Sequence, residues 1–198
     1  MIKILIKIII VLLILVFFLF PAKTFKEYEH LKNPKMRAIP RQKMLVVKSI
    51  GNPNVVGGAA FKTLFKTFYT LKKNNKGLKM SAPKARWPNT PETQKNEWVG
   101  IYGLPIPATV ETLPQGTEKS SPDVKIEYWE YGAVAEILHV GPYNEETPTI
   151  EKLHKFISDS GYKITGPHEE EYLKGPGMFF KGDPKKYQTI IRYCVKNI

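Results

Sequence analysis

An internal repeat restricts the fold of this chain more than any other feature of its sequence. In each half, an apolar strand is followed by an amphipathic helix and then by two more strands. The expected elements are residues 44–50, 59–73, 78–87 and 97–106 in the first half, and residues 133–140, 149–161, 162–173 and 187–195 in the second. The halves align at VVKSIGNP with AEILHVGP, at FKTLFKTF with IEKLHKFI, and at KMSAPKARW with KITGPHEEEY.

A single strand-helix-strand-strand unit buries only one face of its sheet, so we expect the two units to pack together. The repeat therefore predicts an α+β fold of duplicated βαββ modules with pseudo-two-fold symmetry. The modules should share an antiparallel sheet, with the helices on one side and a ligand groove between the halves on the other. The predicted domain spans residues 43–198, with halves at about 43–107 and 123–198.

The N-terminus carries an apolar stretch from Ile2 to Ala22 that only Lys3 and Lys7 interrupt. A helix of this length, at about 1.5 Å per residue, spans a bilayer. We therefore predict a single-pass membrane anchor in residues 1–22, which contacts the membrane through residues 2–22. A cleaved signal peptide that ends at Ala22 is the alternative. The basic segment 23–42 is expected to be a tether, and the side of the membrane stays open because lysines flank both ends of the span.

The charge and the residue spacing exclude several classes of function. Half of the net charge of +12 lies in residues 1–42, and no helix-turn-helix, zinc-finger or RNA-binding motif accompanies it, so we expect no nucleic-acid partner. Cys194 is the only cysteine, which excludes an intramolecular disulfide and a cysteine-based zinc site. Because the histidines show no metal-ligand spacing, no metal site is predicted. The domain is expected to be a monomer without catalytic residues.

The segment HEEEY (168–172) places three carboxylates in a row on an expected strand of a basic chain. Side chains alternate between the two faces of a strand, so Glu169 and Glu171 should lie on one face. His168, Glu170 and Tyr172 should lie on the other. Two interpretations stay open: solvated acids on a partly wet face, or a pocket carboxylate beside an aromatic ring.

Glu136 is the most suggestive single residue, because it alternates with Val134 and Leu138 on an apolar face of an expected interior strand. A buried carboxylate must be paired, hydrogen-bonded or raised in pKa. Glu136 is therefore either a pocket acid or the partner of a basic residue in the same domain. His139 is expected to be structural, and GPYNEETP (141–148) is expected to be a turn with Thr147 as the N-cap of the next helix.

The second half resembles the GyrI-like small-molecule-binding domain, which also forms the effector-binding half of some AraC-type regulators. The resemblance is carried by A-x-x-x-H-x-G-P-Y (135–143), G-Y-x-I-x-G-P (161–167) and E-x-Y-L-x-x-P (170–176). The first half, through F-x-x-L-F (61–65) and L-K-M-S-A-P (78–83), also resembles SOUL haem-binding proteins of the same superfamily. Relatives often carry Thr-Glu in the last strand, whereas here Thr189 is followed by Ile190. Glu136 and the HEEEY acids are then the remaining candidates for a pocket charge.

Together with the predicted anchor, the resemblance implies a membrane-tethered domain that binds small hydrophobic or cationic molecules without catalysis. Haem or tetrapyrrole binding, as in SOUL proteins, and small-molecule hydrolysis are the alternatives. Trp87 and Tyr172 either form opposite walls of the groove or pack within the domain, and both interpretations stay open. An acid between aromatic walls favours a hydrophobic cation. The candidate ligand-binding residues are Glu136, Glu170, Tyr172, Trp87, Tyr102 and Tyr193.

Overall fold

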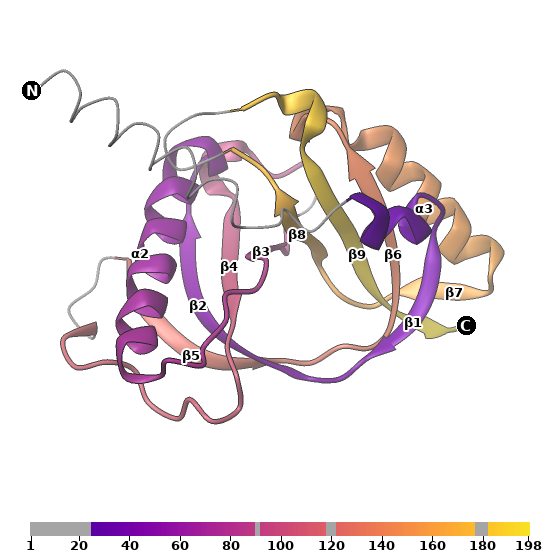
Figure 1. Cartoon of the computed structure of the whole chain (residues 1–198). Coiled ribbons are helices and arrows are strands. Elements are labelled where there is room, and N and C mark those ends of the chain that lie inside the picture. Colours follow the sequence, from indigo (N-terminus) through magenta and orange to yellow (C-terminus); the bar gives the residue numbers. More distant parts are fainter. Residues whose placement is uncertain (1–24, 90–91, 118–121, 177–181) are drawn as a thin grey trace, which may run out of the picture. The chain divides into compact units, whose positions relative to one another are not determined.

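The structure is a computed structural model that describes residues 25–89, 92–117, 122–176 and 182–198. The chain divides into two units, Met1–His30 and Leu31–Ile198. Of the first unit, the structure describes residues 25–30, which belong to the 3-10 helix η1 (Phe25–Leu31). Figure 1 labels the helices and strands of the second unit, which contains the sheet.

The second unit is built on a nine-stranded antiparallel sheet in the order β1-β6-β9-β8-β3-β4-β2-β5, with β7 paired to β9 outside this path. The strands are β1 (Lys35–Ile39), β2 (Gln42–Ile50), β3 (Lys84–Trp87), β4 (Val99–Pro105), β5 (Val124–Trp129), β6 (Gly132–Val140), β7 (Tyr162–Ile164), β8 (His168–Lys174) and β9 (Gln188–Asn197). Short 3-10 helices η2 (Lys95–Glu97), η4 (Tyr143–Glu145) and η5 (Pro184–Lys186) lie in the connections. The predicted α+β class and antiparallel sheet are confirmed.

The strand order repeats in mirror image about the centre of the sheet. Strands β6, β9 and β8 of the second half occupy the places that β2, β4 and β3 occupy in the first, and β8 meets β3 at the junction. Each half also begins with a strand that the predicted βαββ module lacks, β1 in the first and β5 in the second. These added strands cross over, since β1 pairs with β6 and β5 pairs with β2.

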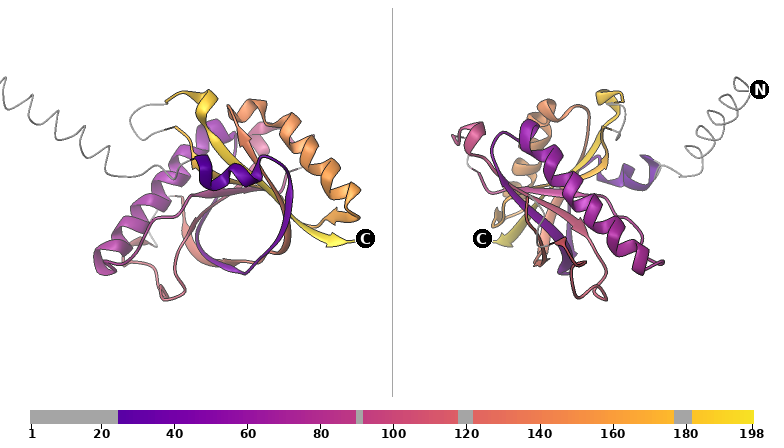
Figure 2. Two further views of the ribbon diagram at one scale, coloured as in Figure 1. Left: turned by 45° about the vertical axis from the view of Figure 1, so that its right-hand side comes forward. Right: turned by 90° about the vertical axis from the view of Figure 1, so that its left-hand side faces the viewer.

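Strand β1 corrects the expected start of the domain. Residues 35–39, expected to belong to a tether that ends at residue 42, pair with β6 along their whole length. Only Pro40 and Arg41 separate β1 from β2, and Glu130 and Tyr131 separate β5 from β6. Strands β1 and β2 therefore form one nearly continuous bent ribbon, and β5 and β6 form another. The two ribbons pair side by side and join the two ends of the sheet (Figures 1 and 2). A chain that began at Lys43 would leave the edge of β6 unpaired.

Two helices cover one face of the sheet, named here the helix face. Helix α2 (Pro53–Asn74) packs on the first half, and α3 (Thr147–Asp159) packs on the second (Figure 1). The buried residues of α2 recur at helical spacing, which explains why this segment forms an amphipathic helix: they include Ala60, Leu64, Phe68 and Leu71. Leu153 and Ile157 do the same in α3. The helix face thus has two separate apolar cores with the junction of the halves between them.

Register partners in the sheet show which side chains share a face. On the helix face one row runs across six strands through Val47, Tyr102, Ala85, Glu170, Ile191 and Ile137. Glu170 is the one charged member of this row, and it lies at the junction. On the opposite face, named here the far face, the neighbouring row runs through Arg86, Glu169, Arg192 and Glu136. The alternation predicted for HEEEY places Glu170 in the row on the helix face and Glu169 in the row on the far face.

The row on the far face is a buried ladder of alternating charge. Arg86 Nε donates to Glu169 at 2.7 Å, and Arg192 donates to Glu169 at 2.8 Å and to Glu136 at 2.7 and 2.8 Å. Glu171 lies 3.1 Å from both terminal nitrogens of Arg192. Arg192 is only 1% exposed. Each carboxylate in the ladder faces a cation, so its charge is paired within the protein.

Replacing Arg192 by Met should unfold the protein more easily, because three carboxylates would lose their shared buried partner. Breaking a buried ion pair from one side costs about 3 to 5 kcal/mol, so we expect the free energy of unfolding in urea to fall by about that amount. The control is Lys155→Met, which removes an exposed pair with Asp159 and should change stability by less than about 1 kcal/mol. Equal effects of the two substitutions would contradict the role assigned to Arg192.

The predicted membrane anchor, residues 1–22, lies outside the described residues. Within the part of the chain that the structure covers, no helix combines the length and the apolar character that crossing a bilayer requires.

Candidate functional site

Five of the six predicted binding residues lie together on the helix face, near the junction of the halves. Glu170 and Tyr172 alternate with the ladder acids on β8, and Tyr193 follows Arg192 on β9 in the same way. Trp87 and Tyr102 come from the first half and pack in its apolar core. We expected the groove on the face of the sheet opposite the helices. The structure instead places these five side chains on the helix face, which α2 and α3 cover.

Glu136 is the exception and needs a correction. It lies on the far face, is 1% exposed, and contacts Arg192 as well as Arg37 Nε at 2.7 Å. The second interpretation given for it, pairing with a basic residue of the domain, therefore describes its contacts. Both partners come from strands that flank β6, β1 on one side and β9 on the other.

Aromatic rings form a continuous chain from α2 to the connection before α3. Phe61 of α2 contacts Tyr102 and Tyr172 edge-on, with ring centroids 5.1 and 5.7 Å apart. Trp87 extends the chain at one end, 5.6 Å from Tyr102, and Tyr143 extends it at the other, 5.6 Å from Tyr172. Aromatic pairs in this geometry stabilise each other and present ring faces and edges to a neighbour.

Glycines make room for two of these rings. A Cβ atom at Gly100 would come within 2.7 Å of the Tyr102 ring, and one at Gly175 would come within 2.6 Å of the Tyr143 hydroxyl. Real Cβ atoms do not approach other atoms this closely, so any larger residue at either position would displace the tyrosine. The positions of both rings therefore depend on a glycine, which lies two residues before Tyr102 on β4 in one case and directly after β8 in the other.

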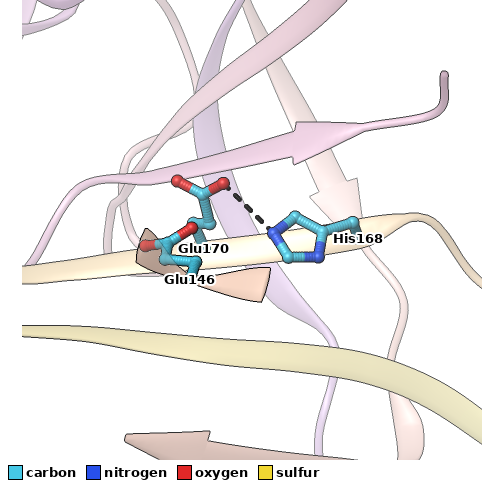
Figure 3. Close-up of side chains that lie close together, drawn as sticks. All are labelled: Glu146, His168 and Glu170. Atoms are coloured by element: carbon cyan, nitrogen blue, oxygen red, sulfur yellow. Dashed lines mark hydrogen bonds and ion pairs between the residues drawn. The ribbon is translucent and has the colours of Figure 1, made fainter. Parts of the chain in front are cut away.

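An acid, a histidine and a second acid meet beside these rings (Figure 3). His168 Nε2 lies 3.1 Å from Glu170 Oε1, and its Nδ1 lies 2.7 Å from the hydroxyl of Tyr193. Glu146 precedes α3 and brings its carboxylate to the same place, so that donor atoms of Glu146, His168 and Glu170 all lie within 4.8 Å of one another. These three are the residues of the site that could hold a metal.

Burial and mutual repulsion keep the Glu146 carboxyl neutral in the absence of a cation. Burial raises its pKa from 4.5 to about 9, and the nearby Glu170 carboxylate adds to the shift. Burial also raises the pKa of Tyr102 to about 12, again with a contribution from Glu170. The pKa values of Tyr172 and Tyr193 rise for the same two reasons. Glu170 is thus the charge around which the polar groups of this face are arranged.

Several polar atoms of this face have no hydrogen-bond partner. Five such buried side-chain atoms occur among the described residues, and four belong to the helix face. The four are Trp87 Nε1, the Tyr102 hydroxyl, Glu146 Oε1 and the Thr189 hydroxyl, and the fifth is Arg86 Nη2 of the far face. Buried polar atoms normally have partners, so a concentration of unpaired ones indicates a place where a bound molecule or ion would supply them.

Two cavities lie elsewhere in the described part of the chain, and no predicted binding residue lines either of them. One, of about 220 Å³, is on the far face beside Arg86, Glu169, Arg192 and Cys194. Three of these residues already pair with one another in the ladder. The other, of about 400 Å³, lies between the end of α2 and residues 109–115.

Glu146 and His168 were not among the predicted binding residues. Glu146 lies in the segment expected to be a turn, and α3 begins at Thr147 with Glu146, rather than Thr147, as its N-cap residue. The alternation of HEEEY did place His168 on the face of Glu170, and this was the one available signal. His139 has the structural contacts expected of it, to Thr149 and to the carbonyl oxygen of Pro142.

The chain belongs to the family of GyrI-like small molecule binding domains, whose sequence model matches residues 32–192. Its fold is similar to that of a conserved protein from Listeria innocua, with a TM-score of 0.74 and 24% identity over 86% of this chain and 98% of that one. It is also similar to the fold of a hydrolase from Listeria innocua, with a TM-score of 0.71 and 24% identity over 87% of this chain and 98% of that one. For the C-terminal domain of EcmrR, the TM-score is 0.58 and the identity is 16% over 84% of this chain and 98% of that one. No curated protein matches the chain.

The substitution Glu146→Gln should stabilise the metal-free protein. In the unfolded chain this carboxyl ionises near pH 4.5, whereas in the folded chain it keeps its proton up to about pH 9. The wild type therefore loses stability as the pH rises between these values, and the glutamine variant does not. We expect the variant to gain about 1 to 3 kcal/mol in urea unfolding at pH 7 in chelator-treated buffer, and more at pH 8.

The matched control is Glu145→Gln, because Glu145 is the exposed neighbour of Glu146. It should change stability by less than about 0.5 kcal/mol at either pH. If Glu146→Gln instead lost stability, the Glu146 carboxylate would have to be ionised and paired in the folded protein.

Proposed function

We propose that this chain binds small organic cations that carry an apolar group, and that it does so reversibly on the helix face near the junction of its halves. The observation that carries the proposal is the concentration of unpaired buried polar atoms around two acids, Glu146 and Glu170, within a chain of aromatic rings. Membership of a small-molecule-binding family supports it.

The chemistry of this face favours a cation over a neutral or anionic ligand. A cation near Glu170 would gain charge pairing, and would allow Glu146 to ionise, because a positive charge between two carboxylates removes their repulsion. Aromatic faces attract cations by about 0.5 to 2 kcal/mol, and more strongly where water is excluded. An anion would be repelled by Glu170 and by the electron-rich faces of the aromatic rings.

The alternatives to this function stay predictions. Hydrolysis would need an acid or base that can exchange a proton with the substrate. Among the described residues, His168 could act in this way, because it contacts the Tyr193 hydroxyl on one side and the Glu170 carboxylate on the other. Haem binding would need an iron ligand, and the histidine beside Glu146 and Glu170 is His168, whose two ring nitrogens already contact neighbours.

Benzyltrimethylammonium and neopentylbenzene test the preference for a cation, because they have the same shape and differ in one charge. We expect the cation to raise the unfolding temperature of the chelator-treated protein in a saturable way. The neutral isostere should bind about tenfold more weakly, since a pairing energy near 1.4 kcal/mol corresponds to a factor of ten.

Glu170→Gln should remove most of this preference while leaving the weak binding of the neutral compound in place. Glu127→Gln is the control, since Glu127 is exposed on β5, away from the aromatic chain. Equal binding of the two compounds by the wild type would rule out the proposed charge recognition.

We also propose that residues 2–22 tether the domain to a membrane, on the basis of their apolar sequence. The full chain should stay with the membrane fraction in 1 M salt and be released by detergent, because salt screens charge pairing but does not weaken the burial of an apolar helix. A chain that lacks residues 2–22 should be released by salt. Release of the full chain by salt alone, or a mature N-terminus after Ala22, would exclude the anchor.

A further inference from the structure

The structure assigns a divalent metal site to Glu146, His168 and Glu170. His168 and Glu170 lie two residues apart on β8 and therefore share a face, while Glu146 reaches them from the start of α3 (Figure 3). Metal bonds to nitrogen and oxygen are about 2.1 Å long, so ligand atoms around one ion lie within about 4.2 Å of each other. The donors here already lie within 4.8 Å, and a small movement of the side chains would complete the site.

The state of Glu146 is an independent observation that points to a missing ion. This residue is 6% exposed, and its Oε1 has no hydrogen-bond partner in the described structure. The fully buried hydroxyl of Thr189 lies close to this carboxyl but makes no hydrogen bond of good geometry with it. A buried carboxylate oxygen needs a donor or a cation, and a metal between Glu146 and Glu170 would satisfy both acids.

Tyr193 supplies the outer contact that a metal-binding histidine requires. Such a histidine uses one ring nitrogen for the metal and the other for a hydrogen bond that fixes the ring. The Nδ1 atom of His168 lies 2.7 Å from the Tyr193 hydroxyl, and Nε2 faces the carboxylate of Glu170. With the metal on Nε2, Nδ1 carries the proton and donates a hydrogen bond to the oxygen of Tyr193. Tyr193 is then a positioning residue and not a ligand.

The set of donors selects the class of metal. One imidazole and two carboxylates suit Zn²⁺, Mn²⁺ or Fe²⁺, whereas Mg²⁺ and Ca²⁺ prefer oxygen ligands alone. The charge of a divalent ion balances two carboxylates. Three protein ligands leave at least one coordination position for water or for another molecule. This inference goes beyond organic-cation binding, since it assigns a second class of ligand to the same two acids, and the two ligands should compete.

Titration of the untagged full chain in detergent, after removal of metals with a chelator, tests the assignment. We expect one Zn²⁺ per chain by calorimetry, and a visible absorption band when Co²⁺ replaces it. Glu146→Gln and His168→Gln should each weaken Zn²⁺ binding by at least about tenfold, and Tyr193→Phe by about tenfold or more. Glu145→Gln, the exposed neighbour, should bind like the wild type.

Folding and the organic ligand are controlled separately. The unfolding temperature of each variant in chelator shows that it is folded, and Tyr193→Phe keeps the shape of the side chain. Absence of saturable Zn²⁺ binding by the wild type, or equal affinities of Glu146→Gln and Glu145→Gln, would overturn the site. Benzyltrimethylammonium binding measured in chelator on the same protein is independent of this result, so failure of the metal site and failure of the cation site would be distinguishable.

Discussion

The rest of the structure depends on the buried ladder of alternating charge on the far face. It runs from Arg86 through Glu169 and Arg192 to Glu136, and so it crosses the junction where β3 of the first half meets β8 of the second. Buried ion pairs add little net stability compared with apolar packing, but a mismatched one is costly. A slip of one residue at the junction would turn Glu169 away from both arginines. The ladder therefore fixes the register between the halves.

Fixing the register on the far face also fixes the helix face, because successive side chains of a strand point to opposite sides. Glu169 and Glu171 contact Arg192, so the residue between them, Glu170, must face the helices. Its register neighbours there are Ala85 and Ile191. The row of residues across the helix face, which is otherwise uncharged, thus acquires one carboxylate at a defined position.

Local patterns in the sequence were sufficient to predict this alternation and the two helices. HEEEY needs only the period of a strand to separate its acids, and the apolar residues of α2 and α3 recur at helical spacing. Strand β1 was missed because its sequence, KMRAI, is short and mostly exposed, and it forms a strand by pairing with β6, almost 100 residues later in the chain. No local pattern reports such a pairing.

The two acids show the same limit at the level of the site. Glu136 has an apolar neighbourhood in its own strand, and only its contacts with the distant residues Arg37 and Arg192 reveal that its charge is already paired. Glu146 lies in a polar turn and looks solvated in the sequence. It is buried because α3 packs on β6, which brings the start of the helix beside β8. Tertiary packing, and not composition, decided which acid belongs to the site.

The halves share a fold but contribute different chemistry to the face between them. The first half supplies apolar and aromatic surface through Phe61, Trp87 and Tyr102, and at the register position of Glu170 it carries Ala85. The second half supplies Glu146, His168 and Glu170. A duplicated sheet would otherwise present the same groups twice, related by its pseudo-two-fold axis. Because only one half is acidic, the junction is polarised, and an amphiphilic cation has one favourable orientation there, with its apolar body over the first half and its charge toward the second.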